Sequence, residues 1–240
     1  MAEIDNERPS GAKARLENFW YHYKWHSIVS AFVIVAILVC SLQMCRKEKY
    51  DGYIMYAGGY AVSRAENSDV AEYVKFVSSF KKVTPDTDEN GVPNPSFLDL
   101  YAPTSEELKD ASNEVYSFTN ENFSRLQYEL VSGSEYYICF LSSANYEKYK
   151  VFSDVQIFTP LVSYVPEGVT VEYYDDCAIY LSSLNFSSLD GINALPDDTV
   201  VCLRTLSAVA SVFDKNENAR NRECAEQILK NILSYTSYTE

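Results

Sequence analysis

The feature that most constrains this chain is an uncharged, nearly continuous apolar run between Ser27 and Cys45. At about 1.5 Å of rise per residue, a helix of these nineteen residues spans roughly 28 Å, close to the roughly 30 Å hydrocarbon core of a bilayer. The run therefore predicts one membrane-spanning helix over residues 27–45. Everything after it is expected to fold as a separate, water-soluble part.

Aromatic residues just before this run match the boundary between lipid and water. Both tryptophans of the protein lie here, and residues 16, 19, 20 and 23 follow the spacing of one helix face. Indole and phenol rings prefer the headgroup level of a membrane. We therefore expect Trp20, Tyr23 and Trp25 at the membrane interface, within a cytoplasmic tail and interfacial helix formed by residues 1–26.

Two alternatives based on cleavage fit this segment poorly. A secretory signal peptide has a shorter apolar run behind a basic tail, whereas the tail here is long and charge-balanced. A lipoprotein would carry a small residue before the modified cysteine, but Val39 precedes Cys40 and Met44 precedes Cys45. The segment is therefore predicted to be an uncleaved anchor.

The basic residues leave the orientation of the anchor open. Those within about 15 positions of its ends are Lys13, Arg15 and Lys24 on one side and Arg46, Lys47 and Lys49 on the other. The positive-inside rule therefore gives a tie. Long domains are translocated largely regardless of charge, so a cytoplasmic N-terminus with an exported C-terminal domain is allowed.

The charge of residues 46–240 limits the partners of this part. It carries 16 basic and 30 acidic side chains, whereas residues 1–45 carry four of each. A domain of this sign repels phosphate and offers no basic stripe, so we expect no nucleic-acid partner. Its length and its grouped Tyr, Phe, Val, Ile and Leu residues suit one folded domain.

Strand-like and helix-like segments alternate along this domain. Strands are predicted at residues 53–56, 97–102, 136–141, 178–181 and 199–203. Helices are predicted between them, and a last helix begins at about Asn218. This alternation predicts an α/β fold with a mixed sheet covered on both faces.

Two of the predicted helices carry a start signal and an apolar face. The first follows the capping pair Ser63 and Glu66, with core positions at Val70, Tyr73, Val74, Val77 and Phe80. The second follows the pair Thr104 and Glu107 and stops at Gly133, with core positions at Phe123, Leu126, Leu130 and Val131. Each pattern predicts which side of its helix faces the sheet.

Two segments resemble known families. The stretch NFWYHYKWH, residues 18–26, with the apolar run behind it, resembles the N-terminus of uncharacterised single-pass membrane proteins of Gram-positive bacteria. That resemblance implies one exported domain. Residues 132–166, SGSEYYICFLSSANYEKYKVFSDVQIFTPLVSYVP, resemble part of one lobe of extracellular solute-binding proteins. A full binding protein has two lobes, whereas this chain has room for one.

Five residues at the ends of predicted strands are candidates for binding a ligand. Gly58 and Gly59 could let a ligand approach the backbone, and Ser142 and Ser143 follow the third strand. Arg204 follows the last strand and could meet an anionic group. Open α/β sheets bind ligands at such ends. The alternatives are a turn that ends the strand, for the glycines, and a salt bridge, for Arg204.

The loop DTDENGVPNPSF, residues 86–97, matches the first half of a calcium-binding loop. The candidate ligands are Asp86, Asp88, Asn90, the Val92 carbonyl and Asn94, with Gly91 at the turn. The second half departs from the pattern, because Phe97 stands where a bidentate Glu is expected. Calcium is the one cofactor that the sequence suggests, and an ordinary polar loop is the alternative.

The sequence contains no catalytic motif of high specificity. Both histidines, His22 and His26, precede the membrane run, which removes histidine-based triads and metal sites from the soluble part. Asp175 and Asp176 are neighbours and predict a solvated turn rather than a pair that shares a proton. We therefore expect a non-catalytic protein, with carboxylate-dependent hydrolysis as the remaining enzymatic option.

Four cysteines of the soluble part lie in or beside predicted elements: Cys139, Cys177, Cys202 and Cys224. Because no CxxC pair is present, burial as small hydrophobic residues is expected. One disulfide stays open as an alternative if the domain is exported.

The sequence thus predicts a membrane-tethered, extracytoplasmic domain that recognises a ligand or a partner. Twenty tyrosines supply the rigid amphipathic contact area common in binding surfaces. Two versions compete, a solute-sensing lobe and a scaffold that docks another membrane or envelope protein. A deep pocket near Gly58, Ser142 and Arg204 would favour the first, and a flat tyrosine-lined patch would favour the second.

Overall fold

A computed structural model describes residues 11–45, 50–60, 62, 70–109, 112–206 and 215–236. The chain divides into two units, Met1–Lys49 and Tyr50–Glu240.

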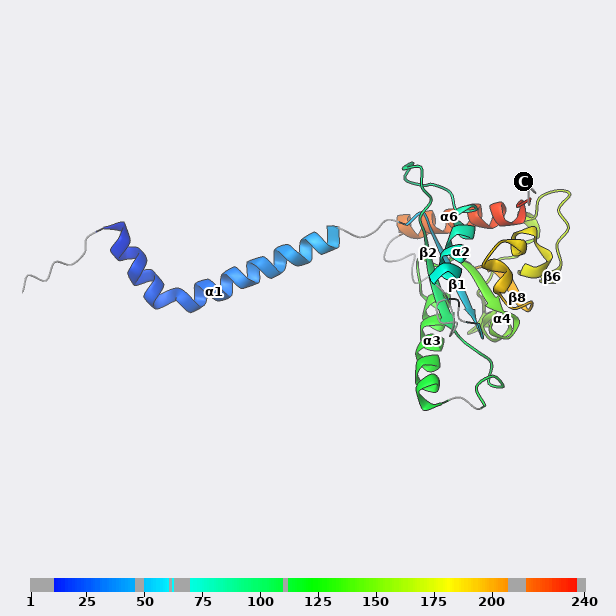
Figure 1. Ribbon diagram of the computed structural model, residues 1–240, viewed down its shortest axis with the longest axis horizontal. Coiled ribbons are helices and arrows are strands. Elements are labelled where there is room, and N and C mark those ends of the chain that lie inside the picture. The colour runs from blue at the N-terminus through cyan, green and yellow to red at the C-terminus, as the bar shows by residue number, and fades with distance from the viewer. Residues whose placement is uncertain are drawn as a thin grey trace, which may run out of the picture. The chain divides into compact units, whose positions relative to one another are not determined.

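The described part of the first unit is one helix, α1 (Ala12–Cys45) (Figure 1). Its segment Glu17–Ser41 is long and apolar enough to cross a membrane. The segment starts earlier than the predicted run, because it includes the aromatic residues that precede Ser27. Trp20, Tyr23 and Trp25 are all more than half exposed, as expected of side chains that face lipid or its headgroups.

The second unit is built on one six-stranded mixed sheet (Figure 1) with the order β2-β1-β3-β8-β7-β6. The strands are β1 (Gly52–Gly58), β2 (Pro95–Tyr101), β3 (Ile138–Ser142), β6 (Tyr173–Asp175), β7 (Ala178–Tyr180) and β8 (Thr199–Leu203). Parallel pairing joins β1 to β2 and β3, whereas β8 and β7 run antiparallel to their neighbours. The predicted mixed α/β sheet is confirmed.

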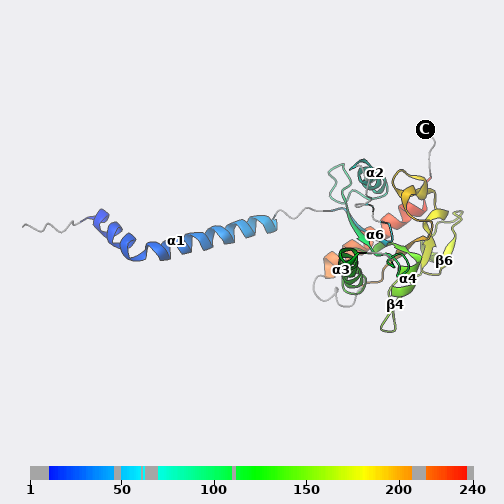
Figure 2. The same ribbon diagram turned by 60° about the horizontal axis from the view of Figure 1, so that its bottom comes forward.

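Side chains alternate between two cores along the central strands. On β1, Ile54 and Tyr56 enter one core, and Met55 and Ala57 enter the other. The first core is covered by α2 (Val70–Lys81) and α6 (Lys215–Leu233), and the second by α3 (Asn113–Val131) and α4 (Ser143–Tyr149) (Figure 2). Because both faces are buried, these strands read as continuous apolar runs.

Several short elements had no clear signal in the sequence. The strands β4 (Val151–Phe152) and β5 (Val155–Gln156) form a separate hairpin (Figure 2). The 3-10 turns are η1 (Val162–Tyr164), η2 (Leu181–Ser183), η3 (Asn185–Ser188) and η4 (Ile192–Ala194). Elements of two to four residues are too short for hydrophobic periodicity to reveal.

The predicted core face of α2 is wrong in part. Phe76 and Phe80 are buried, whereas Tyr73 and Val74 are 37% and 53% exposed. The two phenylalanine rings pack against each other and against Phe97 of β2. Phenylalanine buries more apolar area than valine and, unlike tyrosine, has no hydroxyl to satisfy, so Phe76 and Phe80 take the side of the helix that meets the sheet. Ser63 and Glu66, the predicted start signal, lie outside the described residues.

The predicted start of α3 is also wrong. Thr104 and Glu107 do form a capping box, in which the Thr104 N–H and hydroxyl donate to Glu107 at 2.6 and 2.8 Å, but only a turn follows. The helix begins at Asn113, and the Ser112 hydroxyl accepts from the Val115 N–H. A capping box satisfies the first N–H groups, but an apolar face must follow for the helix to continue.

Candidate functional site

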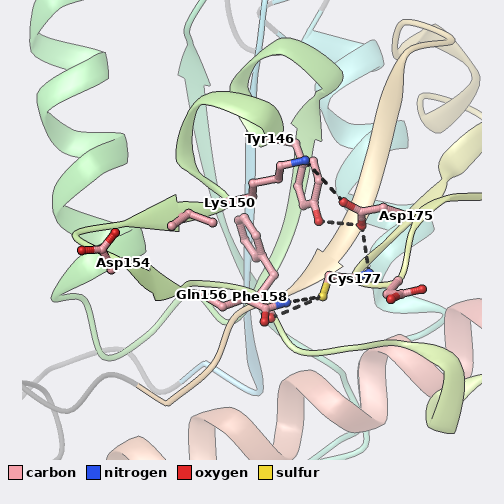
Figure 3. Close-up of a pocket in the computed structure, with 9 residues that line it drawn as sticks. Tyr146, Lys150, Asp154, Gln156, Phe158, Asp175 and Cys177 are labelled. Atoms are coloured by element: carbon pink, nitrogen blue, oxygen red, sulfur yellow. Dashed lines mark hydrogen bonds and ion pairs between the residues drawn. The ribbon is translucent and has the colours of Figure 1, made fainter.

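The larger of the two described pockets lies beside the β4–β5 hairpin and has a volume of about 460 Å³ (Figure 3). We call it the hairpin pocket. It is lined by Tyr146 and Lys150 of the α4 segment, Val151, Asp154 and Gln156 of the hairpin, Phe158, and Asp175, Asp176 and Cys177 at the β6–β7 turn. Two separate segments of the chain, residues 146–158 and 175–177, therefore build it.

The short helix α4 brings two of these residues to one side. The Ser142 hydroxyl caps its start by accepting from the Asn145 N–H, and the Lys150 N–H donates to the Tyr146 carbonyl at its end. Residues four apart in a helix lie on the same face. Tyr146 and Lys150 consequently both reach the pocket.

The hairpin holds its acidic residue on a tight turn. Val151 pairs with Gln156 and Phe152 with Val155, which leaves a two-residue loop. Its residues, Ser153 and Asp154, have φ angles of +49° and +64°. Positive φ at both positions defines a type I′ turn, for which Asn-Gly is the usual sequence. Asp154 is thus exposed at the rim of the pocket in a backbone conformation that favours glycine.

Asp175 is the best-anchored polar group of the hairpin pocket (Figure 3). Its Oδ1 accepts from the Tyr146 hydroxyl at 2.7 Å and from the Cys177 N–H at 2.9 Å. Its Oδ2 lies 3.8 Å from Lys150 Nζ. Two hydrogen bonds and one ion pair, from two segments, therefore fix the orientation of this carboxylate.

The floor of the pocket is aromatic and sulfur-containing. The rings of Tyr146 and Phe158 stack with their centroids 5.1 Å apart. The Gln156 amide donates to Cys177 Sγ at 2.8 Å, and the Cys177 thiol donates to the Phe158 carbonyl at 3.5 Å. An apolar floor with a few oriented polar groups is the usual composition of a small-molecule site.

Burial and neighbouring groups push three pKa values of this pocket away from neutrality. Burial, with Asp175 as hydrogen-bond partner, raises the pKa of Tyr146. Burial and the Asp175 charge raise the pKa of the Cys177 thiol. The hydrogen bond to Glu147 raises the pKa of Lys150. All three groups therefore keep their protons at neutral pH.

The predicted ligand residues do not assemble into one site. Gly58 and Ser142 are the last residues of β1 and β3, and Gly59 and Ser143 follow them, so these four lie where the two parallel strands end. Arg204 lies at the opposite end of the strands, because β8 runs antiparallel to β3. Thr199 pairs with Ser142, and Leu203 pairs with Ile138. The sequence does not reveal the direction of β8, so the predicted position of Arg204, at the same strand ends as Gly58 and Ser142, is wrong.

Arg204 is also unavailable to a ligand. It is 1% exposed, and its guanidinium donates to the carbonyls of Glu129 and Gly133 at the end of α3. Its positive charge lies 4.4 Å from the Tyr137 ring centroid. Burial lowers its pKa from the ordinary value. The prediction of an anion site at Arg204 is therefore corrected to a structural role.

The other four predicted residues have structural roles: the two glycines leave room for neighbouring side chains, and the two serines form hydrogen bonds within the protein. A side chain at Gly58 would meet Tyr56, and one at Gly59 would meet Glu107. Ser142 caps α4, and the Ser143 hydroxyl donates to Asp198 at 3.0 Å. None of the five lines the hairpin pocket.

The predicted calcium loop gains a residue from elsewhere in the chain. Oxygens of Asp86 and Asp88 lie within 4.8 Å of each other and of Asp51, which precedes β1. Asn90 turns toward Asp88. Its side-chain Nδ2 donates to Asp88 Oδ2 at 2.8 Å, and its side-chain Oδ1 accepts from the Val92 N–H. Asp51 was missed because it lies far from the loop in sequence.

The carboxylates of this cluster already hold the loop together. Asp51 accepts from the Thr87 N–H and hydroxyl and from the Asn94 N–H. Burial raises the pKa of Asp51, but these hydrogen bonds outweigh it and leave the pKa below the ordinary value. Asp86 accepts from the N–H groups of Asn90 and Gly91. The cluster therefore has a loop-closing role whether or not it binds an ion.

The cysteines of the second unit are buried free thiols, as the sequence predicts by default: Cys139, Cys177, Cys202 and Cys224. Cys139 and Cys202 lie opposite each other on β3 and β8. Burial raises the pKa of Cys202 far above its ordinary value. These thiols therefore behave as small core residues.

Comparison with protein-family models, with curated proteins and with solved structures gave no match for this chain. The two resemblances noted in the sequence therefore remain expectations.

Proposed function

We propose that this chain is a membrane-tethered recognition protein whose α/β domain binds a small ligand in the hairpin pocket. The observation that carries the proposal is the pocket itself. Its volume of about 460 Å³ lies within the roughly 300–1,000 Å³ of small-molecule sites. Val151, 55% exposed at its wall, offers apolar contact, and the fixed Asp175 carboxylate adds orientation.

Preorganisation of the pocket supports binding. Tyr146, Lys150 and the Cys177 N–H hold Asp175 in place without any ligand. A ligand that uses this carboxylate would not have to order it first, which lowers the cost of association.

The pKa directions favour recognition over catalysis. Catalytic acids and bases usually have pKa values near the working pH, so that they can exchange protons. Tyr146, Cys177 and Lys150 all have pKa values raised by their surroundings. They therefore act as fixed hydrogen-bond donors or charges.

A carboxylate-dependent hydrolase is the second candidate, because Asp154, Asp175 and Asp176 all line the pocket. Such enzymes need one carboxyl group in apolar surroundings that keep it protonated as the general acid. Asp154 and Asp176 are exposed, and Asp175 faces Lys150 and two other donors. These surroundings fit acceptors better than acids.

The proposal includes an extracytoplasmic location for the domain. Support comes from the anchor-length helix and from the resemblance at residues 18–26. Protease added to intact cells should then cut the second unit and leave α1 in the membrane fraction. A domain that stays uncut until the cells are lysed would place it in the cytoplasm instead.

A fragment screen with matched variants tests ligand binding. The full chain in nanodiscs of zwitterionic lipid is screened by ligand-observed NMR against cationic, neutral and anionic fragments. Val151 and Val155 are 55% and 61% exposed on the same hairpin, but only Val151 lines the pocket. Hits should disappear in Val151→Trp, which fills the pocket, and persist in Val155→Trp.

Two results would overturn the proposal. Fragments that bind both tryptophan variants equally would place binding elsewhere, and a protein without hits would leave the pocket without a ligand role. Turnover of a chromogenic glycoside that is lost in Asp175→Asn would favour the hydrolase. A membrane protein cross-linked to the hairpin in intact membranes, without small-ligand binding, would favour the scaffold version.

A further inference from the structure

We infer that the hairpin pocket selects an organic cation, a primary amine or guanidinium carried on an apolar body. This inference rests on the proposed function and names the chemical class of its ligand.

The charges that line the pocket have one dominant sign. Lys150 is the only cation among the nine lining residues, against three aspartates. Its charge is already matched, because Nζ lies 2.8 Å from Glu147 Oε1 and 3.8 Å from Asp175 Oδ2. An anionic ligand would have to compete with both carboxylates for Lys150.

Two of the lining carboxylates have no such match. Within the described part of the chain, Asp154 and Asp176 make no ion pair and their carboxylates accept no hydrogen bond, and both are exposed. They come from different segments, the hairpin tip and the β6–β7 turn. Figure 3 shows the hairpin residue Asp154 on one side of the Tyr146 and Phe158 rings and Asp175 on the other. A cation that enters between these segments is attracted from both sides.

The apolar lining of the pocket suits the remainder of such a ligand. The rings of Tyr146 and Phe158 stack on each other and are each 1% exposed, so they form a closed floor. Val151, which is 55% exposed, adds open apolar surface at the wall. Lys150 Nζ already lies 5.9 Å from the Tyr146 ring centroid, so the ligand's cation is attracted by the carboxylates and not by this ring. Charge attraction and apolar burial therefore act together on an amine with an aromatic or aliphatic body.

The experiment uses three probes that share one body and differ in charge: phenethylamine, 2-phenylethanol and 3-phenylpropionate. Their dissociation constants are measured by ligand-observed NMR on the full chain in zwitterionic nanodiscs, with empty nanodiscs as the blank. We expect phenethylamine to bind most tightly and 3-phenylpropionate least. Higher ionic strength should weaken the binding of phenethylamine only.

Charge-removing variants locate the effect. Asp154→Asn and Asp176→Asn should each weaken phenethylamine binding roughly two- to fivefold, as expected for exposed ion pairs. The affinity for 2-phenylethanol should not change. Asp197→Asn removes the same charge from an exposed residue that does not line the pocket, and it should leave all three affinities unchanged. Near-ultraviolet circular dichroism checks that each variant is folded.

The possible failures are distinguishable. If 2-phenylethanol or 3-phenylpropionate binds as well as the amine, and Val151→Trp abolishes that binding, the pocket is a ligand site and the cation inference is wrong. If Asp197→Asn weakens phenethylamine binding as much as Asp154→Asn and Asp176→Asn do, only the overall charge of the domain matters. That result also overturns the inference. If none of the three probes binds, the inference is wrong, and the fragment screen decides the proposed function separately.

Discussion

The guanidinium of Arg204 lies 2.6 Å from the carbonyl oxygen of Gly133, so the residue that follows β8 holds the chain at the end of α3. It also donates to the carbonyl of Glu129, one turn earlier. The last carbonyls of a helix have no partner within the helix, and a cation near them is favourable. One buried side chain thus joins the sheet to the helix that covers its second core.

Removal of this side chain should destabilise the fold. We expect Arg204→Met to lower the free energy of unfolding by about 3 kcal/mol, because two buried carbonyls lose a charged donor. Arg204→Lys should lower the free energy of unfolding by less, since its ammonium group can still donate to one of the two carbonyls. Unfolding is followed by near-ultraviolet circular dichroism of tyrosine, because both tryptophans lie in α1.

A second arginine serves as the control for this prediction. Arg220 is exposed and donates to the Thr87 hydroxyl at 3.1 Å. Arg220→Met should therefore lower the free energy of unfolding by less than about 1 kcal/mol. Equal losses for the two arginines would contradict the helix-end role of Arg204.

The hairpin turn should show a trade-off between stability and binding. Asp154 has a φ of +64°, which favours glycine. We expect Asp154→Gly to raise the free energy of unfolding by up to about 1 kcal/mol by relief of that backbone cost. The same substitution should weaken phenethylamine binding. Thermal unfolding and NMR titration of the same sample measure both effects.

Asp176→Gly is the matched comparison, because Asp176 is not among the residues with positive φ. At this position glycine only increases the chain entropy of the unfolded state, so we expect the free energy of unfolding to fall by about 0.5–1 kcal/mol. A loss of stability in Asp154→Gly as well would contradict the assignment of a type I′ turn.

Alkaline pH should destabilise the domain through its buried thiols. Burial raises the pKa of Cys224 from the ordinary value of 9.0 to about 11. The folded state therefore holds this proton more tightly than the unfolded state. Its stabilising effect is complete below pH 9 and is lost as the pH rises to 11, by about 3 kcal/mol at most.

Substitution of the thiol isolates this effect. Cys224→Ala should flatten the fall in unfolding free energy between pH 9 and 11. The fall above pH 10 should remain, because burial also raises the pKa of tyrosines such as Tyr53, to about 12. Cys40→Ala, on α1, should leave the profile unchanged. Parallel curves for the parent and Cys224→Ala would show that Cys224 does not contribute.

The acidic cluster gives the calcium hypothesis a sharper test than the loop alone. If Asp51, Asp86 and Asp88 bind calcium, millimolar calcium should raise the melting temperature of the second unit, since an ion that binds only the folded state stabilises it. Asp86→Ala with Asp88→Ala should abolish the shift, and Asp51→Asn should reduce it. A parent protein without any shift would leave the carboxylates with the loop-closing role alone.

Much of the fold could be predicted from hydrophobic pattern. β8 has the predicted bounds, and α6 begins three residues before the predicted Asn218. The strands of the central sheet are buried on both faces, so they read as apolar runs that end at turn residues. The predicted start of α3 at Thr104 is wrong, because the capping box there is a local hydrogen-bond pattern that does not specify whether a helix continues.

The candidate site was largely beyond prediction. Asp175 and Asp176 were interpreted as a solvated turn, and that turn is present, but it also forms one wall of the hairpin pocket. Tyr146 and Lys150 reach the same pocket from about thirty residues earlier in the chain. Such a convergence depends on how two-residue strands and a seven-residue helix pack, and these elements have no periodic signal.

The amino-acid sequence alone predicts a helix of membrane-spanning length and composition, an acidic α/β domain behind it, and burial of the cysteines of that domain. These properties follow from local composition and periodicity, which a linear chain displays directly. The antiparallel direction of β8 is visible only in the folded domain, and it places Arg204 at the end of α3, away from the other predicted ligand residues. The same is true of Asp154 and Asp175, which line one pocket from opposite sides, because strand direction and contacts between distant segments are set by packing of the whole domain.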